Sequence, residues 1–102
     1  MNTDDLIKQS RARFDHNVAK KVLKEKYLAK MIFVHNEGMF RAGPELASTL
    51  QACNGLETAV IIDLYENPVK INVAELIEIN KQRWQEQMNA WLLEYEESRK
   101  KR

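Results

Sequence analysis

The sequence predicts a small α+β domain in which two long helices flank two pairs of short strands. Two long segments at the ends of the chain lack glycine and proline and have helical residue spacing. Between them lie two strand pairs, rich in β-branched and aromatic residues, each folded back at a turn. A shorter segment between the pairs begins with proline and ends before glycine. The predicted order is helix, hairpin, helix, hairpin, helix, with a small antiparallel sheet packed by the two long terminal helices.

The chain has 102 residues, of which 44% are hydrophobic and 30% are charged. This composition is typical of a globular protein, so residues 1–102 are expected to form a single domain. Cys53 is the only cysteine and has no partner for an internal disulfide. The first ten residues lack the basic start and apolar run of a signal peptide, and no apolar run approaches the ~20 residues that span a bilayer. A cytoplasmic protein is therefore expected.

The first helix is predicted to begin at about Thr3 and to end in the mid-twenties. Aspartates occupy its first turn and lysines its last turns, an arrangement that the helix dipole favours at both ends. Ile7, Phe14, Val18 and Val22 are spaced seven, four and four residues apart. This spacing places them on one narrow apolar stripe.

Two hairpins are predicted in the middle of the chain. The first pairs residues 31–34 with residues 39–42, and Gly38 is expected to take the left-handed conformation at the end of its turn. The second pairs residues 58–65 with residues 69–72 across a turn that contains proline.

The two remaining helices have clear start signals. Pro44 suits the first position of a short helix, which Asn54-Gly55 would end. Asn72 is predicted to cap the last helix, and Glu75, three residues on, could reach back to it. The last helix is expected to run from Val73 to near the carboxyl end. Its apolar stripe contains Val73, Ile77, Trp84, Met88, Trp91 and Tyr95.

The last helix predicts an interface because it is too long for the small sheet to cover. About 25 residues at 1.5 Å each give a length of ~37 Å, so its distal half needs other apolar cover. The first helix could supply that cover, within one chain or between chains. Aromatic residues and methionine are enriched in interface cores. The expected partner is a second copy, with a dimer favoured, or another protein chain. The predicted interface residues are Phe14, Val18, Trp84, Met88, Trp91, Leu92 and Tyr95.

The polar residues form no pattern typical of a catalytic or metal site. His16 and His35 are far apart, and no cysteine or second histidine stands at metal-ligand spacing from either. Cys53 falls on the apolar side of the short helix, where a free thiol is ordinarily a small core residue. The glutamate pairs of the last helix lie on a predicted solvated face, which does not adapt carboxylates to acid–base work. We therefore expect a protein that is not an enzyme and uses no cofactor.

The charge distribution supports an alternative function. Residues 1–30 carry eight basic and four acidic side chains, whereas residues 37–78 carry two basic and seven acidic ones. Basic residues of the first helix gather away from its apolar stripe, and these are Arg13, Lys20, Lys21 and Lys24. They could contact phosphates, which would make the protein a small regulator of nucleic acid or of the transcription machinery. A charged helix face is more often simply solvated, so nucleic-acid contact is not favoured.

Three features together resemble small proteins carried by tailed bacteriophages of the contractile-tail kind. They are the segment Tyr65–Asn72, a following helix with Trp84, Met88-Asn89 and Trp91, and the segment Phe40–Leu46. The resemblance covers about the last two-thirds of the chain and implies no particular activity or binding residue. It implies a virion assembly factor, a minor structural subunit or an accessory protein of host takeover, located in the host cytoplasm.

Overall fold

The structure is a computed structural model that describes the backbone of residues 3–100 and the side chains of residues 16–100. Its elements in chain order are α1 (Thr3–Lys30), β1 (Ile32–His35), β2 (Gly38–Arg41), α2 (Pro44–Ala52), β3 (Thr58–Ile62), β4 (Pro68–Asn72) and α3 (Val73–Lys100). The predicted α+β class is confirmed.

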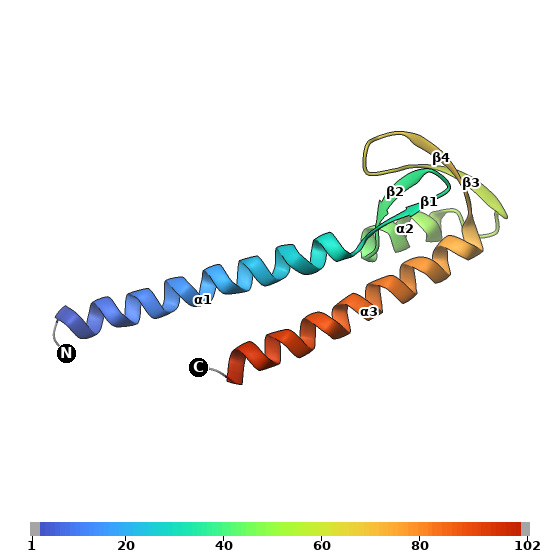
Figure 1. Cartoon of the computed structure of the whole chain (residues 1–102). Coiled ribbons are helices and arrows are strands. Elements are labelled where there is room, and N and C mark those ends of the chain that lie inside the picture. Colours follow the sequence, from blue (N-terminus) through green and yellow to red (C-terminus); the bar gives the residue numbers. More distant parts are fainter. Residues whose placement is uncertain (1–2, 101–102) are drawn as a thin grey trace.

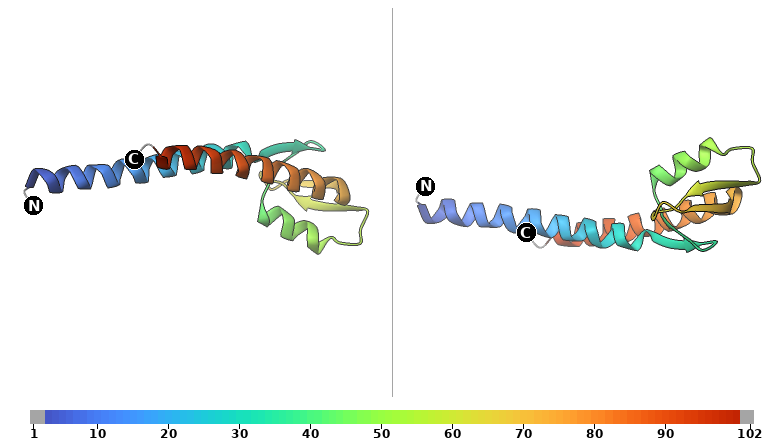
Figure 2. Two further views of the ribbon diagram at one scale, coloured as in Figure 1. Left: turned by 90° about the horizontal axis from the view of Figure 1, so that it is seen from below. Right: turned by 90° about the horizontal axis from the view of Figure 1, so that it is seen from above.

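The molecule is elongated, because α1 and α3 project together from one end of the remaining elements (Figure 1). Its principal dimensions are 66, 25 and 21 Å, and its radius of gyration is 19.3 Å, against about 13 Å for a compact chain of this length. The two long helices run antiparallel and side by side, and the first half of α1 extends past the end of α3 (Figures 1 and 2). We call residues 31–80 the head, and α1 with residues 81–100 the stalk.

The four strands form two separate antiparallel pairs, β1 with β2 and β3 with β4. The expectation of one sheet is therefore wrong. The loop after β3 occupies the edge of β2 that a third strand would need. Leu64 N donates to Met39 O at 2.8 Å, and Met39 N donates to the Asp63 carboxylate at 3.1 Å. With the backbone groups of Met39 already bonded, β2 has no free position there for a ladder.

The first hairpin has a tighter turn than predicted. His35 pairs directly with Gly38, and the two turn residues, Asn36 and Glu37, have φ angles of 50° and 67°. Positive φ at both positions is typical of a two-residue turn whose twist matches that of the strands. Gly38 does not take the left-handed conformation, so that prediction is wrong. Glycine is needed there because a Cβ atom would lie 2.7 Å from Val69 Cγ2.

Helix α1 continues to Lys30, beyond its predicted end in the mid-twenties. No glycine or proline interrupts this segment, and its last turns are held by packing. Tyr27 is buried against α3, and Met31, directly after the helix, is buried in the head. The local pattern changes at Tyr27, but tertiary contacts decide where the helix ends.

The core lies within the head. Leu50, Ile71 and Leu76 are the largest fully buried side chains among the described residues. Residues of β3 alternate between buried and exposed positions, as do those of β4, so each strand presents one face to α2 and α3. Trp84 and Trp91 pack against the edge of this core while remaining partly exposed.

The predicted starts of α2 and α3 are confirmed. Helix α2 begins at Pro44, with Gly43 at its N-cap. The Asn72 side chain accepts a hydrogen bond from Glu75 N at 3.0 Å, which is the bond that an N-cap makes. Only this half of the predicted reciprocal pair occurs among the hydrogen bonds of the described residues.

Asn80 fixes the position of α2 relative to α3. Its side chain is buried, accepts a hydrogen bond from Gly43 N at 2.8 Å and donates one to Gly43 O at 3.2 Å. Both backbone groups of Gly43 are thereby satisfied at the point where the chain enters α2. Because a buried polar group is costly without partners, these two bonds favour the observed placement of the start of α2 against α3.

Candidate protein-binding surface

The stalk helices pair with each other within the chain. The rings of Tyr27 and Trp91 are stacked, with centroids 6.1 Å apart and planes 4° apart. The Tyr27 hydroxyl donates to Glu94 Oε1 at 3.4 Å, and Lys26 Nζ lies 2.7 Å from the same oxygen. Near the head, α1 therefore supplies part of the apolar cover that α3 requires.

The ion pair of the stalk orients the helices more than it stabilises them. The hydrogen bond from Lys26 holds the pKa of Glu94 below its usual value, and the same bond raises the pKa of Lys26. The two side chains are nevertheless 44% and 38% exposed, so water and salt screen their attraction. The ammonium groups of Lys26 and Lys30 also lie 5.3 and 5.1 Å from the centroid of the Tyr27 ring.

An apolar groove of about 300 Å³ runs between the two helices of the stalk. We call it the stalk groove, and its lining residues are Lys20, Leu23 and Lys24 of α1 with Met88, Trp91, Leu92 and Tyr95 of α3. Leu92 is 53% exposed and Met88 is 37% exposed. Two large apolar side chains therefore contact water in a groove that Trp91 and Tyr95 also line.

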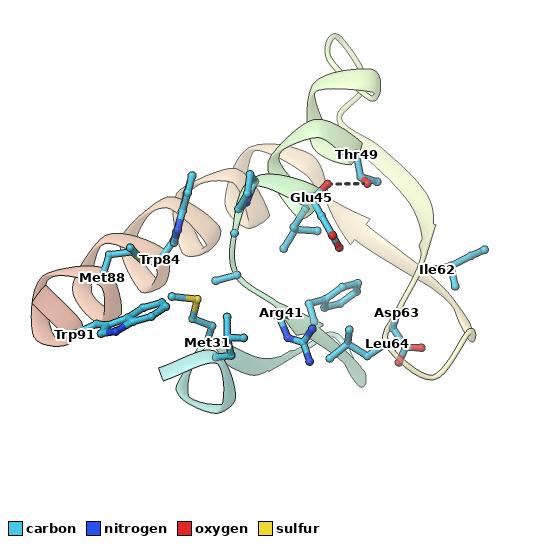
Figure 3. Close-up of a pocket in the computed structure, with 16 residues that line it drawn as sticks. Met31, Arg41, Glu45, Thr49, Ile62, Asp63, Leu64, Trp84, Met88 and Trp91 are labelled. Carbon is cyan, nitrogen blue, oxygen red and sulfur yellow. Dashed lines mark hydrogen bonds between the residues drawn. The ribbon is translucent and has the colours of Figure 1, made fainter. Parts of the chain in front are cut away.

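A second groove, of about 440 Å³, lies where the stalk meets the head. We call it the head groove. Trp84, Met88 and Trp91 project into it from α3, and Arg41 with Asp63 lies toward its other end (Figure 3). The two grooves share Met88 and Trp91. Together they leave an apolar band along α3 that extends from the head into the stalk.

The Asp63 carboxylate of the head groove is bound entirely to backbone groups. One oxygen accepts hydrogen bonds from Tyr65 N and Asn67 N at 2.9 Å each, and the other accepts from Met39 N at 3.1 Å. The bonds from Asn67 and Met39 are the main causes that lower the pKa of Asp63. This carboxylate is therefore ionised and already bonded. It suits a structural role, in which it joins the two hairpins, better than it suits acid–base chemistry.

The structure brings five of the seven predicted interface residues onto one surface. Trp84, Met88, Trp91, Leu92 and Tyr95 all line one or both grooves. Val18 is exposed and lies nine residues before Tyr27. At 100° per residue it is therefore on the side of α1 away from α3. The side chain of Phe14 lies outside the described residues.

The structure also places only some of the predicted phosphate-binding residues in the stalk groove. Lys20 and Lys24 line the stalk groove, where their aliphatic stems cover apolar surface. Lys21 is exposed next to them. Arg13 lies outside the residues whose side chains are described.

Sequence reasoning missed three residues that build this surface. Leu23 and Tyr27 form the face of α1 that meets α3, and their four-residue spacing could have indicated it. Asn80 stands between Ile77 and Trp84 at the spacing of the apolar stripe, and a polar residue at such a position indicates a buried hydrogen bond.

No group of three or more His, Cys, Asp or Glu side chains able to hold a metal ion occurs in the part of the chain that the structure describes. None of the described helices combines the length and apolarity needed to cross a bilayer. The chain matches no protein-family model, no curated protein and no solved structure at a level that indicates relationship.

Proposed function

We propose that this chain is a non-enzymatic protein-binding domain that assembles with a second copy of itself, or with another protein chain, through the stalk. The observation that carries the proposal is the exposure of Met88 and Leu92 beside Trp91 in the stalk groove. The helix–hairpin–helix–hairpin–helix arrangement serves this role by holding one end of the stalk in a packed head.

The lining of the stalk groove favours a protein partner. Aromatic residues and methionine are enriched in interface cores, and an aromatic side chain that is already held in place loses little entropy on binding. Trp91 is held by its stack on Tyr27. A helix that covered the exposed parts of Leu92 and Met88 would gain a fraction of the ~1.5–3 kcal/mol that complete burial of such a side chain contributes.

The charges of α3 make nucleic acid the less favoured partner. Lys20 and Lys24 face the stalk groove, but residues 84–98 on its other side carry four glutamates and no lysine or arginine. A phosphate backbone following the lysines would run close to these carboxylates, and like charges at that distance repel. A protein helix with charges of both signs has no such conflict.

The resemblance to proteins of contractile-tailed bacteriophages supports a role in assembly. A small domain that associates through a helical stalk would suit a virion assembly factor, a minor structural subunit or an accessory protein acting in the host cytoplasm. An elongated molecule with an exposed apolar band along its stalk also has the shape expected of a component that docks on other chains.

Two neighbouring leucines allow a sharp test of this function. Leu92 lines the stalk groove, whereas Leu93, at 65% exposure, does not. We expect Leu92→Gln to weaken self-association at least about tenfold, since it removes one buried leucine from each copy. The matched variant Leu93→Gln should associate like the wild type. Light scattering during size-exclusion chromatography, over a micromolar concentration series, measures both.

Three results would contradict the proposal or part of it. A wild-type protein that remains monomeric at the highest concentration would exclude self-assembly and leave only a different chain as partner. Equal loss in the two leucine variants would show that association does not use the groove. Salt-sensitive binding of a labelled DNA duplex or single strand, lost on Lys20→Glu with Lys24→Glu, would favour the nucleic-acid alternative.

A further inference from the structure

The two sides of the stalk carry opposite charge. Residues 16–30 of α1 include five lysines and one glutamate, a net charge of +4 with histidine neutral, and residues 84–98 of α3 have a net charge of −4. Within the chain the two segments lie side by side, but Lys26–Glu94 is the single ion pair among the described residues. Most of this complementary charge is therefore available to a partner.

The charged residues continue the rows that form the stalk groove. Met88, Leu92 and Glu96 are spaced four residues apart, so they follow one another along the same edge of α3. Lys20 and Lys24 form the corresponding row on α1. All five side chains are exposed. The groove is thus an apolar strip with lysines on one rim and a glutamate on the other.

The contacts inside the stalk fix which residues lie at the same height. Tyr27 is level with Trp91, and Lys26 is level with Glu94. In an antiparallel pair, moving toward the start of α1 corresponds to moving toward the end of α3. Lys24, two residues before Lys26, is therefore level with Glu96, two residues after Glu94.

Two copies that pack groove to groove can be related by a two-fold axis in either of two directions. An axis perpendicular to the helices places α1 over α1 and α3 over α3 of the second copy. That arrangement sets lysines against lysines and glutamates against glutamates. An axis parallel to the helices places each α1 over the partner's α3 without any change of height, so lysines meet glutamates.

We infer that the stalk forms a symmetric dimer about an axis parallel to its helices, with the lysine row of each α1 against the Glu96 edge of the partner's α3. The inference rests on the proposed function and adds the partner's identity and orientation. The strips of Met88 and Leu92 from both copies meet near the axis, and Lys24 of one copy is level with Glu96 of the other. Both heads then lie at the same end of the dimer.

This arrangement explains the placement of charge around the groove. Lysine stems cover the apolar strip while their ammonium groups reach the opposite rim. Unlike charges across an interface select its register and orientation more than they add affinity. The dimer should therefore weaken as salt is raised, because exposed charges are screened beyond about 8 Å at physiological ionic strength.

Charge reversal on single rims tests the orientation directly. Lys24→Glu and Glu96→Lys should each weaken dimerisation about tenfold, since each turns two attractions into repulsions. An equimolar mixture of the two variants should recover affinity to within about threefold of wild type. Inside each variant chain the like charges remain, so recovery can come only from pairing between chains. Sedimentation equilibrium of single variants and of the mixture gives the constants, and thermal melts check that the monomers fold.

Each alternative gives a different result. If the heterodimer of Lys24→Glu with wild type is tighter than the wild-type dimer itself, α1 faces α1, the axis is perpendicular, and the inference is overturned. If the mixture is no tighter than either variant alone, the two rims do not meet and the inference is overturned. The proposed function would still stand in that case if Leu92→Gln weakens association and Leu93→Gln does not. A wild type that does not dimerise would overturn this inference and the self-assembly part of the proposed function, and would leave a different chain as the partner of the stalk groove.

Discussion

The head and the stalk are stabilised in different ways. In the head, buried side chains from both hairpins, α2 and the start of α3 form one core, and Asn80 and Asp63 bond backbone groups of distant segments. In the stalk, Tyr27 is the single buried side chain within residues 16–30 and 81–100. The head therefore has a buried core within one chain, although Val60 and Ile62 are exposed on its outer face, whereas the stalk has almost no buried core of its own.

This difference indicates where stability and function reside. Helices gain most of their stability in proteins from packing of an apolar face, and the outer part of the stalk has little such packing within one chain. The first half of α1 has no helix of the same chain beside it (Figure 1). Substitutions in the head should therefore affect folding first, and substitutions in the outer stalk should affect association first.

The largest effect is expected from a truncation in the core of the head. Leu50 is 1% exposed, so Leu50→Ala should cost about 2–5 kcal/mol of unfolding free energy through lost burial and the cavity left behind. For a domain of this size the melting temperature should fall by more than about 10 °C. Thermal denaturation followed by circular dichroism measures it.

A matched substitution in the same region supplies the control. Val60 lies on the outer face of β3 at 66% exposure, so Val60→Ala should change stability by no more than about 0.5 kcal/mol. Equal effects of the two substitutions would contradict the assignment of the core to the face of β3 that carries Ala59 and Ile61.

A smaller effect is expected at the junction where the head continues into the long helix. Asn72→Ala removes the acceptor for Glu75 N and should cost about 0.5–2 kcal/mol, or several degrees of melting temperature. Asn72→Asp should be tolerated, because a carboxylate also caps and suits the positive end of the helix dipole. Equal tolerance of alanine and aspartate would show that the cap contributes nothing to stability.

The features predicted correctly from the sequence depend on local chemistry. The cap at Asn72 and the start of α2 at Pro44 follow from residue types that favour helix ends whatever surrounds them. The existence of two hairpins follows in the same way from short strand-like runs around turn residues. These signals act over a few residues, so the sequence displays them directly.

The features predicted wrongly depend on contacts between distant segments. Gly38 is required by the closeness of Val69 and not by its own turn. The second sheet is separate because the loop at Asp63 occupies the edge of β2. The face of α1 toward α3 is set by Tyr27, which lies beyond the predicted helix end and away from the apolar stripe of Val18.

The smallest effect is expected for the ion pair of the stalk, and its pH dependence has a definite sign. Glu94→Gln should lower the melting temperature by a few degrees at most, since both partners are exposed. The pKa of Glu94 is lowered in the folded chain, so its contribution is present above 4.5, its unfolded value, and is lost as the pH falls. The pKa of Lys26 is raised, so the pair's contribution is lost on the basic side only as the pH rises through a folded value above 10.5. Melting curves of wild type and variant should therefore differ from about pH 5 to pH 10 and converge in acid. A difference that persisted well below pH 4 would show that the glutamine disturbs the packing of Tyr27 on Trp91 and not the charge pair.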